Sequence, residues 1–264
     1  MDIDLQARVY LVNIGVNSNN GTIKSPIFSD GTFEVMPRPE ARSLWAPTLP
    51  AYPKMSSYND SDEPLSNYVS NRYRNVRVMD DPEFKTFTYG ANLEESRYRK
   101  ILLDCRQGDY LFFVALLSDY DDSFTLNESA FYIVGFIYIT DILPDIRVFP
   151  NGPEFVKFGH NAYIRRAVYH PKTLKGLSIW KGDPSLSKRL KYAVPFDKEF
   201  ILENIPDHRR ENWLNNDVGL RHISHYVRSA RLIFEKKDSL SLHKKLSWWQ
   251  NIGQNNLDIN VPLN

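Results

Sequence analysis

Cysteine is almost absent from this sequence: the 264 residues include one, Cys105. A single cysteine excludes an internal disulfide and a zinc site built from cysteines. It is typical of a reducing compartment, so we expect a cytoplasmic protein. The N-terminus has no basic segment followed by an apolar run, and we expect no signal peptide. The longest apolar runs fall well short of the ~20 residues that span a bilayer, so we also expect no membrane partner.

The net charge of the chain is also small. The formal charge is +1, which excludes a global electrostatic field that would draw the protein to nucleic acid. Any basic surface must therefore be local. Hydrophobic residues make up 42% of the chain and charged residues 25%, as in ordinary soluble globular proteins. We expect a single domain over residues 1–264, with a core of about 8–234 and a C-terminal helical tail over 235–264.

Two apolar runs dominate the middle of the chain, within residues 108–139. Both are rich in aromatic and β-branched residues and neither has a helical apolar stripe, which predicts strands buried on both faces. A polar loop over 118–130 separates them, so we interpret the two runs as a central antiparallel pair. Four residues should be buried in one sheet: Leu111, Phe113, Ile133 and Phe136.

Shorter patterns predict the remaining elements. Residues 7–15 form an apolar run ending in glycine, which we interpret as a first strand near the sheet centre. An Asp30-Gly31 pair predicts a tight hairpin over 27–36. Four prolines make continuous secondary structure improbable over most of 43–80, although its aromatic residues indicate that part of it packs down. A short helix is predicted after Asn161 and a last helix over 242–252.

The first candidate site is the polar loop that follows the first predicted strand. Its amides, hydroxyls and one lysine suit recognition of a base edge or a phosphate. The glycine spacing of a phosphate-binding loop is absent. A hydrogen-bonded surface turn is an equally good interpretation. The candidate residues are Asn13, Asn17, Ser18, Asn20, Lys24 and Ser25.

The second candidate site follows Gly159. His160 could act as a general base or donate a hydrogen bond to phosphate, and Asn161 precedes two arginines, Arg165 and Arg166, that could bind phosphate. The alternative is a capped helix with a solvated basic face. We expect this segment and the 13–25 loop to line one pocket, because functional groups tend to gather on loops at one end of a rigid sheet.

Other candidates are weaker. Arg228 and Arg231 would share one face of a helix, although their alternation with apolar residues also fits a strand. Glu34 and Glu40 could provide a carboxylate that works with His160 in acid–base catalysis, but no spacing selects a pair. The histidines lack metal-ligand spacing, so we expect no metal and no cofactor.

Several short blocks of the chain resemble a known family. They lie at residues 10–17, 24–28, 30–34, 88–90, 108–113, 159–162 and 228–231. Together they resemble the nucleotide-modification-associated domains of the third type, which occur in prokaryotic and phage proteins. The likeness spans most of residues 8–234. The family's name implies an association with base-modification systems and does not assign a reaction.

A second resemblance concerns the central strands. Gly108-Asp109 before an aromatic strand, with residues 132–135 on the next, is similar to PUA-like domains of the EVE, YTH and ASCH groups. Those domains use a small β-barrel to hold RNA or a modified base, although the ASCH-type Gly-x-Lys motif is missing here. The predicted fold is therefore α+β, with a bent, mixed, mostly antiparallel sheet or a PUA-like β-barrel and flanking helices.

These observations favour recognition of a nucleotide, or of a modified base in nucleic acid, in a DNA-modification or defence context. The loop amides would meet the base edge, Tyr89 or Trp45 would stack on the base, and Lys24 and the two arginines after Asn161 would meet phosphate. The first alternative is a nucleotide- or base-modifying enzyme that uses His160 with a carboxylate. The second is a structural or protein-interaction subunit. The sequence does not specify an oligomeric state.

Overall fold

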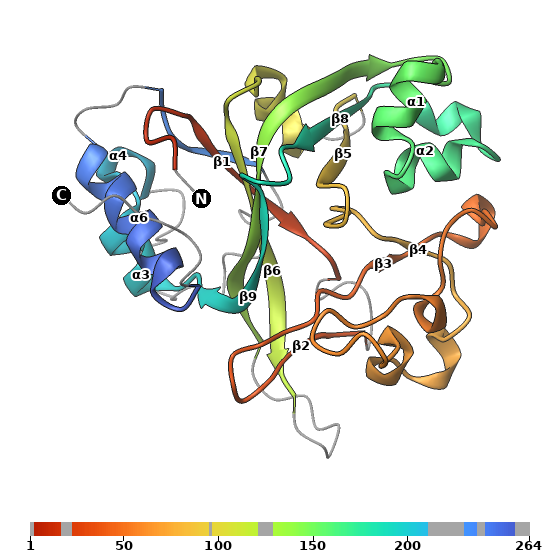
Figure 1. Ribbon diagram of the computed structural model, residues 1–264, viewed down its shortest axis with the longest axis horizontal. Coiled ribbons are helices and arrows are strands. Elements are labelled where there is room, and N and C mark those ends of the chain that lie inside the picture. The colour runs from red at the N-terminus through yellow and green to blue at the C-terminus, as the bar shows by residue number, and fades with distance from the viewer. Residues whose placement is uncertain are drawn as a thin grey trace.

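One large mixed sheet organises the molecule, and segments of the chain cover both of its faces (Figure 1). The computed structural model describes residues 3–16, 23–94, 97–120, 129–210, 230–236 and 241–256. Strand order in the sheet is β10 (Arg231–Phe234), β1 (Val9–Ile14), β6 (Tyr110–Asp119), β7 (Ser129–Ile146), β8 (Leu177–Gly182) and β5 (Thr88–Asn92).

Two further strands extend this sheet. β2 (Ser25–Ile27) pairs with β6 beyond the end of β1, and β9 (Lys188–Pro195) pairs with β7. β1 and β2 run parallel to β6, whereas the other pairs in the sheet are antiparallel. A separate two-stranded sheet joins β3 (Arg38–Pro39) to β4 (Val78–Met79). The predicted α+β class with a mixed, mostly antiparallel sheet is confirmed.

The barrel alternative is wrong, because the sheet is not closed: its strand order ends on β10 at one edge and β5 at the other. β7 explains the strong bend. Its first half pairs with β6 and β9, and its second half pairs with β8. Register shifts between Ile139 and Asp141 and between Leu143 and Ile146 turn the strand, and Asp145 has a positive φ of 45°. Such irregularities increase local twist and bend a strand away from the sheet plane.

The β6–β7 pair is the centre of the core, as predicted. Leu111, Phe113, Ile133 and Phe136 are all fully buried in the one sheet. Successive side chains of a strand point to opposite faces, so Phe113 and its neighbour Phe112 pack against different layers. Phe112 contacts Trp248 at 5.3 Å between ring centroids, and Phe113 contacts Phe84 at 5.6 Å. The aromatic run of β6 has no polar face, and it is stable here because side chains of other segments cover both faces of the sheet.

Helices form the layers on the two sides. α3 (Lys198–Asn204), α4 (Asp207–Arg210) and α6 (Leu242–Gln254) lie on one side of the sheet, and α1 (Gly152–Phe158) and α2 (Ala162–Ala167) lie on the other (Figure 1). The predicted C-terminal helix is confirmed as α6. Its Trp248 and Trp249 are fully buried in the main core, so this part of the predicted tail packs against the sheet.

The segment between β3 and β5 forms a lobe of short turns, as its prolines predict. Its 3₁₀ turns are Arg42–Leu44, Tyr52–Lys54, Leu65–Tyr68 and Asn71–Tyr73, and two more lie at Arg97–Asp104 and Pro171–Leu174. A small core that includes Tyr52, Leu65, Val69 and Val78 anchors the lobe. The Tyr52 hydroxyl donates to the Pro37 carbonyl at 2.7 Å. The lobe therefore packs down while lacking long elements.

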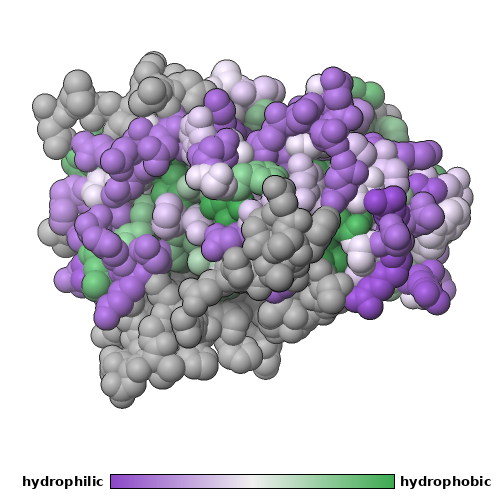
Figure 2. Space-filling view, turned by 90° about the horizontal axis from the view of Figure 1, so that it is seen from below, coloured by the Kyte–Doolittle hydropathy of each residue, from purple (hydrophilic) through white to green (hydrophobic). Residues whose placement is uncertain are grey.

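Seen from below, polar and charged side chains cover both ends of the molecule, and apolar side chains gather between them (Figure 2). In the part of the chain that the structure describes, no helix has the length and apolar character needed to cross a membrane.

Candidate functional site

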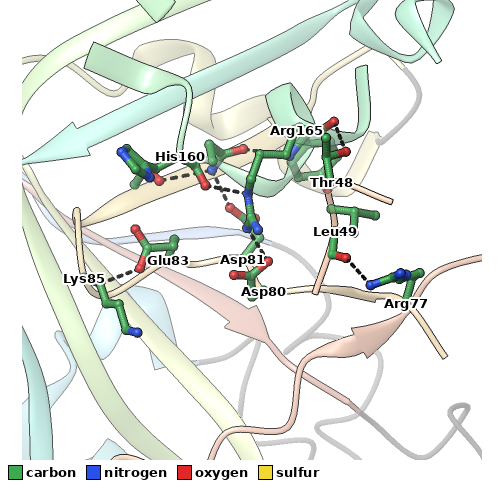
Figure 3. A network of polar contacts seen from close by, with 12 residues as sticks. Thr48, Leu49, Arg77, Asp80, Asp81, Glu83, Lys85, His160 and Arg165 are labelled. Carbon is green, nitrogen blue, oxygen red and sulfur yellow. Dashed lines mark hydrogen bonds and ion pairs between the residues drawn. The ribbon is translucent and has the colours of Figure 1, made fainter. Parts of the chain in front are cut away.

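A cavity of about 370 Å³ opens between the lobe and the α1–α2 region. Its wall combines three carboxylates, four cationic side chains, two aromatic rings and one histidine. These residues are Asp80, Asp81, Glu83, Lys54, Lys85, Arg165, Arg189, Tyr58, Phe84 and His160. Figure 3 shows how Arg165 reaches from α2 toward Asp80, with His160, Glu83 and Lys85 around the same space. Segments far apart in the sequence thus meet at one place.

Gly15 brings the end of β1 into the cavity wall. It has a positive φ of 70°, which side-chain-bearing residues rarely adopt. A Cβ at this position would lie 2.9 Å from Cγ1 of Val35, so the close approach of the next segment also requires glycine. Gly15, His160 and Arg165 line the same cavity, so the end of β1 lies beside the 159–166 segment. The predicted pocket depends on Asn17, which lies outside the described residues, and stays a prediction.

Asn161 positions the segment before β5. It is the N-cap of α2, and its Oδ1 accepts from the Tyr163 amide at 3.0 Å. Its Nδ2 donates to Asp81 Oδ1 at 2.8 Å, and the same oxygen accepts from the Gly90 amide. The predicted capped helix is confirmed. Because Asn161 is fully buried and both ends of its amide are engaged, it fixes the wall and does not face a ligand.

Arg165 ties α2 to two other segments. Its Nη2 donates to Asp80 Oδ1, its Nε donates to the His160 carbonyl at 2.9 Å, and its own carbonyl accepts from the Thr48 hydroxyl at 2.6 Å. Burial raises the pKa of the Asp80 carboxyl, and nearby Glu83 adds to the rise, while the Arg165 charge opposes it. Asp80 is therefore a carboxyl with a perturbed pKa in a cleft, which is a common property of functional sites.

Arg166 has a different role from the predicted phosphate contact. Its side chain is 9% exposed, and Nη1 donates to Glu40 Oε2 at 2.8 Å. The guanidinium lies 5.0 Å from the centre of the Tyr163 ring. Neither Arg166 nor Glu40 lines the cavity. This buried pair joins α2 to the segment after β3, so the structure gives both residues a packing role.

Glu34 also lies behind the cavity wall. It is fully buried and accepts from Ser57 Oγ at 2.5 Å, from the Tyr58 amide at 2.8 Å and from the Asn59 amide at 3.1 Å. Its second oxygen lies 3.4 Å from Arg189 Nη2. A carboxylate with this many partners shapes the loop around Tyr58, and it is not placed beside His160 for the predicted acid–base chemistry.

Arg189 forms the base of the cavity beneath Tyr58. Its guanidinium lies 4.1 Å from the centre of the Tyr58 ring and 4.4 Å from that of Phe33, and Nη2 donates to the Phe33 carbonyl at 2.5 Å. Burial lowers the pKa of Arg189, and Glu34 and Tyr58 oppose the shift. The Tyr58 residue is 48% exposed. One aromatic face thus contacts a cation, and the residue is partly exposed although burial raises the pKa of the Tyr58 hydroxyl.

Two lysines provide accessible positive charge. Lys54 and Lys85 both line the cavity and are exposed, and neither has an ion-pair partner among the residues described. Glu83 is engaged by its own turn instead: Oε1 accepts from the Lys85 amide at 2.6 Å and Oε2 from the Thr86 amide at 2.8 Å. The lysine ammonium groups are therefore available to an anionic ligand.

The structure places the other predicted ligand residues away from the cavity. Ser25 is buried, and its Oγ accepts from the Met36 amide at 3.0 Å. Tyr89 is buried between Phe113 and Trp180, so it cannot stack on a base. Trp45 is 52% exposed but is not part of the cavity wall.

Asn13, Lys24 and Arg231 are partly exposed and likewise do not line the cavity. Asn17, Ser18, Asn20 and Arg228 lie outside the described residues. Sequence reasoning missed Tyr58, Asp80, Lys54, Lys85 and Arg189 as members of one site. The Asp80-Asp81-Pro82 pattern is the strongest local signal for any of them, but such a pattern by itself is typical only of a turn or a helix start.

Residues 8–260 match the model of a protein family described as nucleotide modification associated domain 3. This is the family that the short sequence blocks resemble, and the match extends through α6. No curated protein and no solved structure matches the chain. The likeness to PUA-like domains is not confirmed by these comparisons.

Proposed function

We propose a nucleotide-binding function for this protein, which belongs to the nucleotide modification associated domain 3 family. The family places it in a nucleotide-modification context. The ligand is a nucleotide, or a modified base in nucleic acid, and it occupies the cavity beside Tyr58. The observation that carries the proposal is the partly exposed Tyr58, whose ring contacts Arg189 in a cavity that also contains carboxylates and available lysines.

The cavity suits each part of a nucleotide. Its volume of about 370 Å³ lies within the ordinary range of small-ligand pockets, which runs from about 300 to 1,000 Å³. The Tyr58 ring provides a stacking surface for a base. Lys54 and Lys85 provide charge for phosphate, in place of the two arginines predicted from the sequence. Carboxylates in the wall can accept hydrogen bonds from a base or a sugar.

Tyr58→Ala is expected to weaken nucleotide binding by ~1–3 kcal/mol, which is the usual loss when a base loses its aromatic partner. Titration calorimetry with nucleoside monophosphates, unmodified and base-modified, measures the change. Tyr58→Phe keeps the ring and should keep most of the affinity, so it serves as the matched control. Equal affinity of Tyr58→Ala and the unaltered protein would remove the main support for this site.

Replacing both Lys54 and Lys85 by alanine is expected to reduce the salt dependence of oligonucleotide binding. Each lost phosphate contact should lower the slope of log affinity against log salt by about 1. Lys172, which is exposed and lies outside the cavity wall, provides the control substitution. An unchanged slope in the double variant would show that phosphate binds elsewhere.

A second candidate function is acid–base modification of the bound nucleotide. The specific observation in its favour is that His160 and Asp80 line the same cavity and that burial raises the pKa of Asp80. This pair replaces the predicted combination of His160 with Glu34 or Glu40. Mass spectrometry of nucleotides after incubation with the protein separates the two functions, because binding alone leaves the nucleotide mass unchanged.

A further inference from the structure

We propose that Asp80 selects the ligand by accepting two adjacent hydrogen-bond donors from it. This inference rests on the proposed nucleotide-binding function and deepens it. Two parts of a nucleotide can present such donors: a base edge of the guanine type, with N1–H beside the exocyclic amino group, or the neighbouring hydroxyls of a ribose. A carboxylate can accept two parallel hydrogen bonds, one on each oxygen.

The two arginines in the cavity wall already donate to protein acceptors, whereas the side chains of the two exposed lysines have no such acceptor among the residues that the structure describes. Arg165 donates to Asp80 and to the His160 carbonyl, and Arg189 donates to the Phe33 carbonyl and lies beside Glu34. Beside these arginines, the wall still presents carboxylate oxygens that can accept hydrogen bonds. A ligand that brings donors of its own can complement these oxygens.

Asp80 is the carboxylate best placed to receive them. Both carboxylate oxygens of Glu83 already accept hydrogen bonds from backbone amides of its own turn. Asp81 accepts hydrogen bonds from the Asn161 side chain and from the Gly90 amide. The bond from Arg165 to Asp80 uses Oδ1, and the Asp80 side chain is 17% exposed. An ionised carboxylate has about four lone-pair sites on its two oxygens, so one arginine contact leaves capacity for two further donors.

Arg189 gives a second and independent indication of a ligand. Its side chain lines the cavity and is 9% exposed, and its Nε has no hydrogen-bond partner among the residues that the structure describes. Leaving a buried donor without an acceptor costs roughly 1–3 kcal/mol. A ligand carbonyl oxygen placed beside Arg189, with the base against the Tyr58 ring, would supply this acceptor.

The bases differ in how well they fit such a wall. Guanine combines two adjacent donors with a carbonyl oxygen, which matches both Asp80 and Arg189. Adenine and cytosine pair one amino donor with a ring-nitrogen acceptor. Uracil and thymine place their single N–H between two carbonyl oxygens, which repel a carboxylate. The expected order of affinity is therefore guanine first, adenine and cytosine next, and uracil or thymine last.

The first experiment uses the unaltered protein. Titration calorimetry compares guanosine, adenosine, cytidine and uridine monophosphates with the 2′-deoxy form of each. A guanine preference of tenfold or more in both sugar forms assigns the donors to the base. A tenfold ribose preference across all four bases assigns them to the sugar. Equal affinity for all eight overturns this inference and leaves the proposed function standing, whereas no binding of any nucleotide removes both.

The second experiment uses Asp80→Asn, which keeps an oxygen for Arg165 but presents one donor and one acceptor to the ligand. It is expected to lose at least tenfold in affinity for guanosine monophosphate and to gain affinity for xanthosine monophosphate, whose extra carbonyl accepts from the new amide. If the sugar supplies the donors, the ribose preference disappears instead. Unchanged selectivity would contradict the role of Asp80.

Asp62→Asn is the matched control, because Asp62 is exposed and lies outside the cavity wall, so this substitution should change no selectivity. Thermal unfolding of both variants checks that they are folded. The titration of the eight nucleotides uses the unaltered protein and does not depend on how well the variants fold. If Asp80→Asn folds poorly, that titration can still contradict the inference.

Discussion

Phe113→Ala is expected to lower the free energy of unfolding by about 3–5 kcal/mol, the usual cost of truncating a buried phenylalanine. Phe113 is fully buried in β6, and its ring contacts Tyr89 at 5.5 Å and Phe84 at 5.6 Å between centroids. Removing the ring leaves a cavity between the sheet and the layer that carries the candidate site. The surrounding strands are paired on both sides and cannot collapse to fill it.

Chemical denaturation followed by intrinsic fluorescence measures this loss. Leu103→Ala is a suitable control, because Leu103 is 56% exposed and its truncation removes little buried surface. Surface substitutions of this kind usually change stability by at most about 0.5 kcal/mol. An unchanged unfolding midpoint for Phe113→Ala would contradict the central position of β6.

The parts of the fold that depend on local pattern could be predicted from the sequence. β6 and β7 are long runs of aromatic and β-branched residues, and a continuous apolar run can only be accommodated between two covering layers. The start of α2 is also local, because the cap residue Asn161 and the amide it accepts from are two residues apart. In both cases the interaction that decides the structure lies within the segment that carries the pattern.

The candidate site could not be predicted in the same way, because its members are brought together by tertiary contacts. Arg165 and Asp80 are 85 residues apart in the chain, and Arg189 and Glu34 are 155 residues apart. The sequence shows which residues are charged, but it does not show which of them form ion pairs in the folded protein. Thus Arg166 suggests a phosphate contact in the sequence, whereas in the structure its charge is paired with Glu40.

The predicted barrel fails for a related reason. The resemblance to PUA-like domains depends on short blocks within β6 and β7, and these blocks do form adjacent strands. Closure, however, depends on whether the outermost strands meet. β10 and β5 lie at opposite ends of the strand order, and the bend in β7 leads the chain toward β8. No residue within the two blocks encodes that geometry.

Glu34→Ala is expected to destabilise the protein by about 3–5 kcal/mol, because it leaves the buried Arg189 charge without its carboxylate. The Arg189 and Glu34 side chains are 9% and 1% exposed, so solvent cannot replace the lost partner. The Tyr58 and Asn59 amides would also lose their acceptor. The loop that carries the stacking ring should therefore loosen, and nucleotide affinity should fall together with stability.

The combination of Glu34→Ala with Arg189→Met separates the ion pair from the other contacts. Removing both charges eliminates the uncompensated guanidinium, so the double variant should be less destabilised than Glu34→Ala alone, while the two loop amides still lack an acceptor. Denaturant unfolding of the two single variants and the double variant measures this coupling. A catalytic Glu34 would behave differently, since its removal would abolish turnover at nearly unchanged stability. A stable Glu34→Ala variant, or a double variant whose losses simply add, would refute the structural role that the buried pair assigns to Glu34.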